Sequence, residues 1–92
     1  MHEMADRFES VFDAIASSPE EALNMKLRAG LIREIRIRVK TAEWNQTQTA
    51  RQLGISQPRV SDLLNGKLSK FSLDSLVNML ATLGSDIKLK VA

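Results

Sequence analysis

Apolar residues recur at helical spacing over residues 19–41, the longest such window in the chain. The row has one apolar residue at every fourth position and an isoleucine beside it: Leu23, Leu27, Leu31, Ile32, Ile35 and Val39. Ser18 is suited to the N-cap, Pro19 to the first turn and Glu21 to a capping box. We therefore predict a helix from Pro19 to about Thr41 that turns this row toward a core.

Residues 35–40 of the same window, Ile-Arg-Ile-Arg-Val-Lys, alternate as a half-buried strand does. The helical frame fits the longer window, and Gly30 interrupts that frame at a cost of only about 1 kcal/mol. We therefore extend the predicted helix through residues 35–40.

A shorter helix is predicted after a turn. Asn45 is a preferred N-cap residue, and Gln48 stands three residues later, where a capping box places its second partner. The helix is expected to run to Leu53 and to stop at Gly54, because glycine adopts a positive φ at low cost.

Two further helices are predicted from similar signals. Ser56 caps the first, Pro58 is tolerated in its first turn, and residues 65–66, Asn-Gly, end it. Ser72 caps the second, which Gly84 terminates. The apolar residues expected to face inward are Val60, Leu63 and Leu64 in the first helix, and Leu73, Leu76, Val77 and Leu80 in the second, followed by Leu83.

The two ends of the chain differ from this helical body. Residues 86–91 alternate apolar and polar side chains strictly, which predicts a short strand. Residues 1–17 carry an apolar stripe at helical spacing, but the segment is too short for a stable isolated helix. The stripe consists of Phe8, Val11, Phe12 and Ile15. We therefore divide the chain into an N-terminal arm, residues 1–18, and a body, residues 19–92.

Charge divides the chain in the same way. The net charge is +2, but residues 1–24 carry one base and six acids, a balance of −5. Residues 25–92 carry twelve bases and five acids, a balance of +7. A basic body with an acidic arm suggests two different partners, although two solvated faces would show the same distribution.

Composition argues against several functions. The 92 residues suit one small domain, and the lack of cysteine and of any histidine besides His2 leaves no disulfide framework and no zinc site. No nucleophile–base pair or glycine-rich phosphate loop can be assembled, so we expect neither an enzyme nor a cofactor. Apolar runs of four residues or fewer do not span a membrane, and the first residues lack the order of a signal peptide. We therefore expect a cytoplasmic protein.

Residues 46–64 have the internal order of a helix-turn-helix. Ala50 is small where two helices must approach closely, and Gly54 stands four residues later, at the tight turn. The apolar contacts that hold the two helices together are expected from Leu53, Ile55, Val60 and Leu63. The predicted caps fall at the helix starts that this motif requires.

Residues 45–67, Asn-Gln-Thr-Gln-Thr-Ala-Arg-Gln-Leu-Gly-Ile-Ser-Gln-Pro-Arg-Val-Ser-Asp-Leu-Leu-Asn-Gly-Lys, resemble the Xre/Cro family of repressors. Residues 56–64 together with residues 71–76, Phe-Ser-Leu-Asp-Ser-Leu, look most like HigA-type antitoxins. The first resemblance covers about residues 31–83. It implies a mainly helical, lambda-repressor-like bundle, to which the pattern of residues 86–91 adds a short C-terminal strand.

The second helix of such a motif places its N-terminal side chains in the major groove. Gln57 can pair bidentately with adenine, and Arg59 with guanine or with a phosphate. Ser61 and Asp62 lie further along and can contact bases directly or through water, Asp62 favouring a cytosine amino group. These four side chains are the predicted base-reading residues, although each can also be an ordinary exposed polar group.

Backbone contacts are predicted at both edges of the motif. Gln46 matches the family position that clamps a phosphate, and Ser56 caps the reading helix. Lys67 and Lys70 follow that helix and suit the flanking phosphates. Two other groups are expected to have plain roles: a solvated face for Arg33, Arg36 and Lys40, and core packing for Trp44.

Dimerisation is expected because one helix-turn-helix covers too few base pairs for specificity in a genome. Two copies would place their reading helices in successive grooves about 34 Å apart, on a palindromic operator. A strand at residues 86–91 has too few neighbours to form a sheet within one chain. Pairing with its twin would bury Ile87, Leu89 and Val91.

The acidic arm suggests a second partner. HigA-type antitoxins bind a basic RelE-like ribonuclease toxin and repress their shared operon, so the resemblance implies such a toxin for the stripe Phe8, Val11, Phe12 and Ile15. The alternative is that the stripe packs onto the body as an extra core helix.

The leading hypothesis is thus a dimeric transcriptional repressor that is also an antitoxin. A free-standing or phage-type Xre regulator without a toxin is the nearest alternative. A module that uses the motif only for protein contacts fits less well, because the body of the chain is basic.

Overall fold

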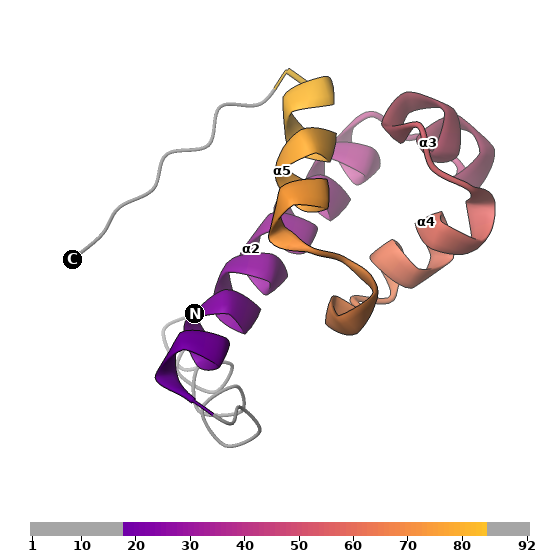
Figure 1. The fold of residues 1–92 in the computed structure, drawn as a ribbon. Helices are drawn as coiled ribbons and strands as arrows, with labels where there is room; N and C mark the ends of the chain where they lie inside the picture. The colour runs from indigo at the N-terminus through magenta and orange to yellow at the C-terminus, as the bar shows by residue number, and fades with distance from the viewer. Residues whose placement is uncertain (1–17, 85–92) are drawn as a thin grey trace.

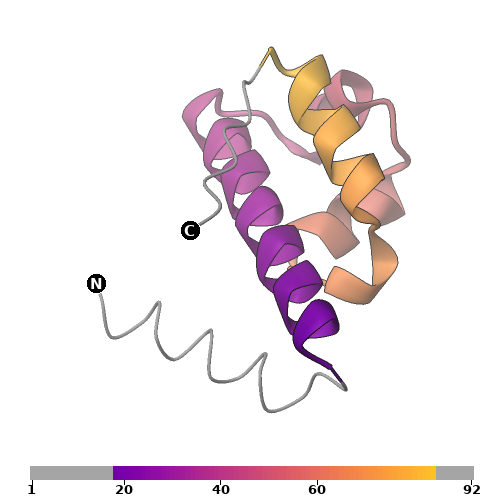
Figure 2. The same cartoon turned by 60° about the vertical axis from the view of Figure 1, so that its left-hand side comes forward.

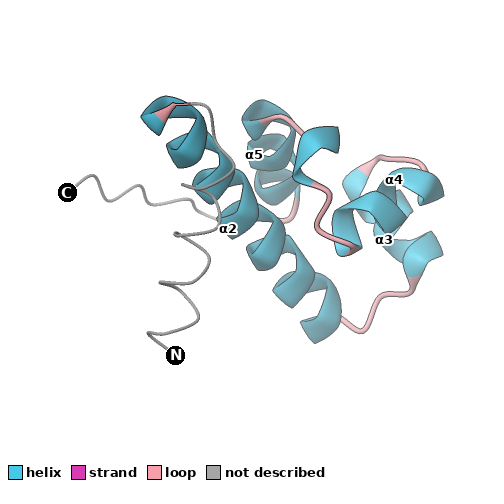
Figure 3. Ribbon diagram, turned by 90° about the horizontal axis from the view of Figure 1, so that it is seen from below, coloured by secondary structure: helices cyan, strands magenta, loops and turns pink. Residues whose placement is uncertain are grey.

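The structure, a computed structural model of the chain, describes residues 18–84. Four α-helices and one short 3-10 helix follow one another in this range: α2 (Pro19–Thr41), α3 (Gln46–Leu53), α4 (Gln57–Leu64), η1 (Leu68–Lys70) and α5 (Leu73–Thr82). All regular structure in the described part of the chain is helical (Figure 3). The apolar stripe of the arm and the strand at residues 86–91 lie outside the described residues, so those two expectations stay predictions.

The helices form two pairs. The long helix α2 packs chiefly against α5, and Figure 2 shows these two helices side by side. The short helices α3 and α4 pack against each other and form a separate lobe in Figure 1. Contacts of α3 with α5, and of α4 and η1 with α2, join the two pairs into one bundle.

The predicted caps and helix bounds are confirmed. Each N-cap side chain accepts a hydrogen bond from the backbone amide three residues later: Ser18 from Glu21 (3.1 Å), Asn45 from Gln48 (2.8 Å), Ser56 from Arg59 (3.4 Å) and Ser72 from Ser75 (3.2 Å). Gln48 returns the bond by accepting from the Asn45 amide at 2.9 Å, which completes the capping box. Residues 35–40 are helical, as the longer window predicted.

The core lies where α2 and α5 meet the α3–α4 pair. Its buried members come from every element except η1 and include the residue that follows η1: Ile32, Ile35, Val39, Leu53, Leu63, Phe71, Leu76, Met79 and Leu80. Trp44 is partly buried against this cluster, which confirms its predicted packing role.

Two predicted core residues are instead exposed. Leu23 is 58% exposed, because residues four apart on a helix of 3.6 residues per turn drift by about 40° each step. The row from Leu23 to Val39 therefore winds around α2, and only its C-terminal part faces the core. In α5, Val77 is 39% exposed, whereas Met79, which the sequence pattern missed, is buried.

Candidate nucleic-acid interface

A tight turn sets α3 and α4 against each other. Gly54 adopts the left-handed conformation at φ 70°, and its amide and that of Ile55 both donate to the carbonyl of Ala50. Ala50 is only half-buried, and the fully buried residue beside it is Thr49. The Thr49 hydroxyl donates to the carbonyl of Asn45 at 2.8 Å, so this buried polar group is satisfied within its own helix.

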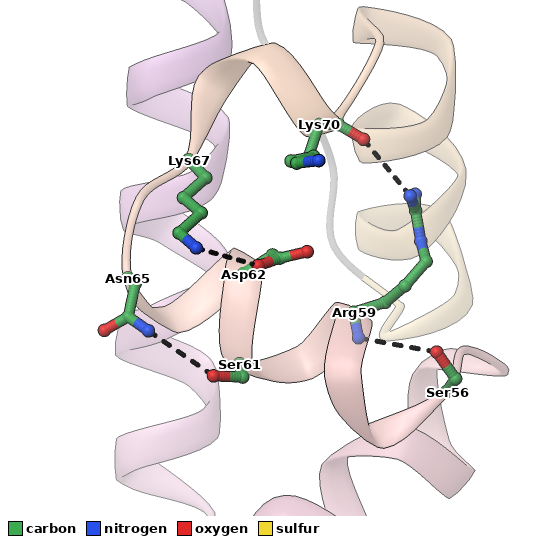
Figure 4. Close-up of polar contacts among 7 residues, drawn as sticks. All are labelled: Ser56, Arg59, Ser61, Asp62, Asn65, Lys67 and Lys70. Carbon is green, nitrogen blue, oxygen red and sulfur yellow. Dashed lines mark hydrogen bonds and ion pairs between the residues drawn. The ribbon is translucent and has the colours of Figure 1, made fainter.

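Burial of one side of α4 leaves a polar row on another. Val60 and Leu63 are fully buried against the bundle. Gln57, Ser61 and Asn65 follow one another at steps of four and therefore lie along one side of the helix. We call these three residues the polar row. The Asn65 amide donates to the Ser61 hydroxyl at 3.4 Å (Figure 4), and both ends of the row are exposed.

The N-terminal end of the polar row meets the start of α3. The side-chain amide of Gln57 donates to the Thr47 hydroxyl at 3.2 Å. Thr47 is exposed and follows Gln46, the first residue of α3, which is exposed as well. The sequence prediction did not include Thr47, although its place in the first turn of the motif's first helix could have suggested it. The structure thus brings Gln57 close to the segment that carries Gln46.

Asp62 and Lys67 form an ion pair. The Lys67 Nζ lies 3.3 Å from an Asp62 carboxylate oxygen, with the lysine side chain 55% exposed and the aspartate 26% exposed (Figure 4). A predicted base-reading residue and a predicted phosphate-binding residue are therefore partners in the free protein. Such a partly exposed pair contributes little to stability, so a phosphate or base can replace either partner at low cost.

Arg59 lies on a different side of α4 from the polar row. Its guanidinium donates to the carbonyl of Lys70 at 3.2 Å and lies 4.5 Å from the centre of the Phe71 ring. Figure 4 shows Arg59 reaching toward Lys70 while Ser61 leaves the helix on the opposite side. Two of the four predicted base-reading residues, Gln57 and Ser61, thus belong to one row, and Arg59 does not.

A second arginine reaches the same segment from α2. The Arg28 guanidinium donates through one nitrogen to the carbonyls of Leu68, at 2.8 Å, and Phe71, at 3.4 Å. Its Nε is buried without a hydrogen-bond partner. Arg28 is forty residues away from Leu68 in sequence, and no local pattern indicates the contact.

The predicted phosphate-binding residues lie at two places. Gln46 and Ser56 are exposed at the N-terminal ends of α3 and α4, where backbone amides point outward. Lys67 and Lys70 are exposed in the segment that follows α4. Arg33, Arg36 and Lys40 lie elsewhere, around a shallow hollow on α2 that also borders Leu64.

Among residues 18–84, no helix is both long and apolar enough to cross a bilayer. The same residues contain no group of three or more histidine, cysteine, aspartate or glutamate side chains placed to hold a metal ion.

One comparison with known proteins identifies a family. A family model described as a helix-turn-helix domain matches residues 11–92, which include every described element. No curated protein matches the chain.

Proposed function

The chain belongs to the helix-turn-helix domain family, and we propose that it is a sequence-specific repressor of transcription that binds double-stranded DNA. The observation that supports this most is the polar row of α4. Another side of α4 is buried through Val60 and Leu63, while Gln57 and Asn65 are exposed and Ser61 between them is half-buried. A helix of this kind, exposed along a polar side, suits insertion into a major groove.

Base contacts are proposed for three of the four residues that the sequence selected, Gln57, Ser61 and Asp62. Gln57 has an amide that can pair bidentately with adenine, and Ser61 one turn later can contact the next bases. Asp62 can accept from a cytosine amino group once Lys67 moves to a phosphate. Arg59 can contact a guanine only by leaving the Lys70 carbonyl and the Phe71 ring.

Backbone contacts would fix the register of α4 on the duplex. Gln46 and Ser56 lie where the N-terminal amides of α3 and α4 favour an anion, and Lys67 and Lys70 supply positive charge in the segment that follows α4. The basic balance of residues 25–92 supports the same partner, because phosphate neutralisation dominates non-specific affinity.

A dimer is part of the proposal. Ile87, Leu89 and Val91, which lie outside the described residues, would pair with their twins and bring two copies of α4 onto a palindromic operator. Sedimentation equilibrium at micromolar concentration measures this directly. A monomer under those conditions, or a dimer unaffected by Leu89→Lys, would contradict the proposed pairing.

We further propose that the repressor is an antitoxin. The resemblance of residues 56–64 and 71–76 to HigA-type antitoxins supports this, and so does the acidic arm with Phe8, Val11, Phe12 and Ile15, which suits a basic RelE-like ribonuclease. Co-purification from the native host identifies the partner. Recovery of the chain without any toxin would favour the alternative, a free-standing or phage-type Xre regulator.

The DNA-binding proposal is tested by selection from a pool of random duplexes. We expect an enriched palindromic sequence, and an affinity for it that falls steeply as salt concentration rises. A pool without an enriched sequence would refute sequence-specific binding. Affinity that does not depend on salt would favour a module for protein contacts instead.

A further inference from the structure

Two arginines from different helices bind the backbone of one short segment. This segment, residues 67–71, begins at Lys67, contains η1 and ends at Phe71. Arg28 of α2 donates to the carbonyls of Leu68 and Phe71. Arg59 of α4 donates to the carbonyl of Lys70. We propose that Arg28 and Arg59 are positioning residues that hold the 67–71 segment, and with it Lys67 and Lys70, against the DNA backbone. This inference rests on the proposed function.

The segment needs such support because its own hydrogen bonds are few. Within it, the amide of Lys70 donates to the carbonyl of Lys67 at 3.1 Å, and the amide of Phe71 donates to that of Leu68 at 3.2 Å. A single 3-10 turn of this kind has poorer hydrogen-bond geometry than an α-helical turn. The Leu68 carbonyl accepts hydrogen bonds from two donors, the Phe71 amide and the Arg28 guanidinium. Arg28 thus adds a bond at the carbonyl that closes this turn.

Arg28 is placed for this task at the expense of its own hydrogen bonding. Its Nε is buried and unpaired, which is unfavourable, while one terminal nitrogen bridges the carbonyl of Leu68, which closes η1, and that of Phe71, which follows it. That nitrogen carries two N–H groups, one for each carbonyl, and the plane of the guanidinium fixes their directions, whereas the donors of a lysine ammonium rotate on a flexible stem. The geometry thus indicates that Arg28 maintains the backbone conformation of η1.

Arg59 holds the same segment from the other side. Its guanidinium lies over the ring of Phe71, which is 3% exposed and belongs to the core cluster, so the ring is a fixed support. The hydrogen bond to Lys70 then joins that support to the backbone of η1. Arg59 would have to give up both contacts to reach a base edge. The arrangement therefore favours a role in which Arg59 supports the phosphate contacts of the 67–71 segment on any DNA sequence, and not one in which it reads a single base pair.

The two roles of Arg59 predict different results on a panel of duplexes. The panel contains the sequence selected by the unmodified protein and its single-base-pair variants. As a positioning residue, Arg59→Ala weakens binding to every duplex by a common factor of about ten and leaves the ratios between duplexes unchanged. As a base-reading residue, Arg59→Ala would abolish discrimination at one base pair only. That second result would overturn the proposal.

Coupling with Lys70 separates positioning from a simple loss of charge. In a Lys70→Ala background, Arg59→Ala is expected to weaken binding by about threefold or less, because the lysine that it positions is already gone. Arg33→Ala is the matched control, since it removes one exposed charge from α2 away from the 67–71 segment. If the double variant loses DNA affinity by the full product of the two single losses, the proposal is overturned.

A measurement without DNA keeps the inference distinct from the proposed function. Amide hydrogen exchange at Lys70 and Phe71 is expected to accelerate by about tenfold in Arg59→Ala and in Arg28→Lys, and to stay unchanged in Arg33→Ala. Arg59→Lys keeps a donor and a charge and should retain most of the protection and affinity. Unchanged exchange would overturn the proposal even if the protein binds DNA as expected, whereas accelerated exchange with no enriched duplex would refute only the proposed function.

Discussion

The α2–α5 pair and the α3–α4 pair are held by different kinds of contact. Ile35 of α2 meets Leu76 and Leu80 of α5 in a buried apolar cluster that joins residues far apart in sequence. In the α3–α4 pair Leu53, Val60 and Leu63 are buried as well, and local contacts within α3 and its turn are added: a complete capping box, a left-handed glycine and a buried hydroxyl that bonds to its own helix.

The difference explains how one small domain can be both stable and available for binding. Apolar burial supplies most of the free energy of folding, and α2 with α5 provides much of it. Local hydrogen bonds set the geometry of α3 and α4 while leaving the polar row uncovered. We therefore expect changes to the buried apolar residues of the first pair to alter stability, and changes on the polar row to alter DNA binding.

The largest expected effect is in the core of α5. Leu76→Ala removes a fully buried side chain and should lower the free energy of unfolding by about 2–5 kcal/mol. Leu23→Ala is the matched control, because Leu23 is 58% exposed, and it should change stability by no more than about 0.5 kcal/mol. Urea denaturation at one fixed protein concentration measures both, and equal losses would show that the two leucines are equally buried in solution.

The next effect is on DNA. Gln57→Ala should leave stability nearly unchanged and reduce discrimination at one base pair by about 1–3 kcal/mol. Gln52→Ala, on the exposed part of α3 outside the polar row, should alter neither property. Affinities for the selected duplex and its single-base variants provide the measurement. Full discrimination by the Gln57 variant would remove that residue from the reading surface.

Two glycines should respond in opposite directions. Gly54→Ala should destabilise the protein by about 1 kcal/mol, because φ at this position is 70° although an added Cβ has space. Gly30→Ala, in the exposed middle of α2 with no atom near the new Cβ, should stabilise by up to about 1 kcal/mol. Thermal unfolding compares the pair. Stabilisation by Gly54→Ala would contradict the turn geometry between α3 and α4.

The smallest expected effect is at the exposed ion pair. Asp62→Asn frees Lys67 and should change stability by less than about 1 kcal/mol, while affinity for random duplexes rises modestly. Asp74→Asn removes the same charge from the start of α5 and controls for the change in net charge. An equal rise for both variants would mean that Asp62 acts through overall charge and not through its place on α4.

The helix bounds of the described region could be predicted because their signals are local. Ser18, Asn45, Ser56 and Ser72 each bond to an amide three residues away, so side chain and partner stand together in the sequence. Gly54 likewise ends α3 through its own φ. The motif followed from these bounds, whereas the polar row, which includes Asn65 and leaves out Arg59, was not predicted.

The inward and outward faces of α2 and α5 were predicted less well. Leu23 and Val77 were expected in the core and are exposed, because the burial of a helix position depends on which neighbouring helices cover it. A regular spacing in sequence describes one helix and contains no information about its partners.

The sequence by itself determined where each described α-helix begins and ends, and where the turn between α3 and α4 lies, because those features depend on hydrogen bonds spanning three or four residues. Tertiary structure alone decided that Arg28 and Arg59 meet on the 67–71 segment. Arg28 is forty residues from the carbonyl that it binds, and only the packing of α2 against η1 brings the two together. It also turned Arg59 away from the polar row, because the Phe71 ring and the Lys70 carbonyl offer its charge two partners that no local pattern reveals.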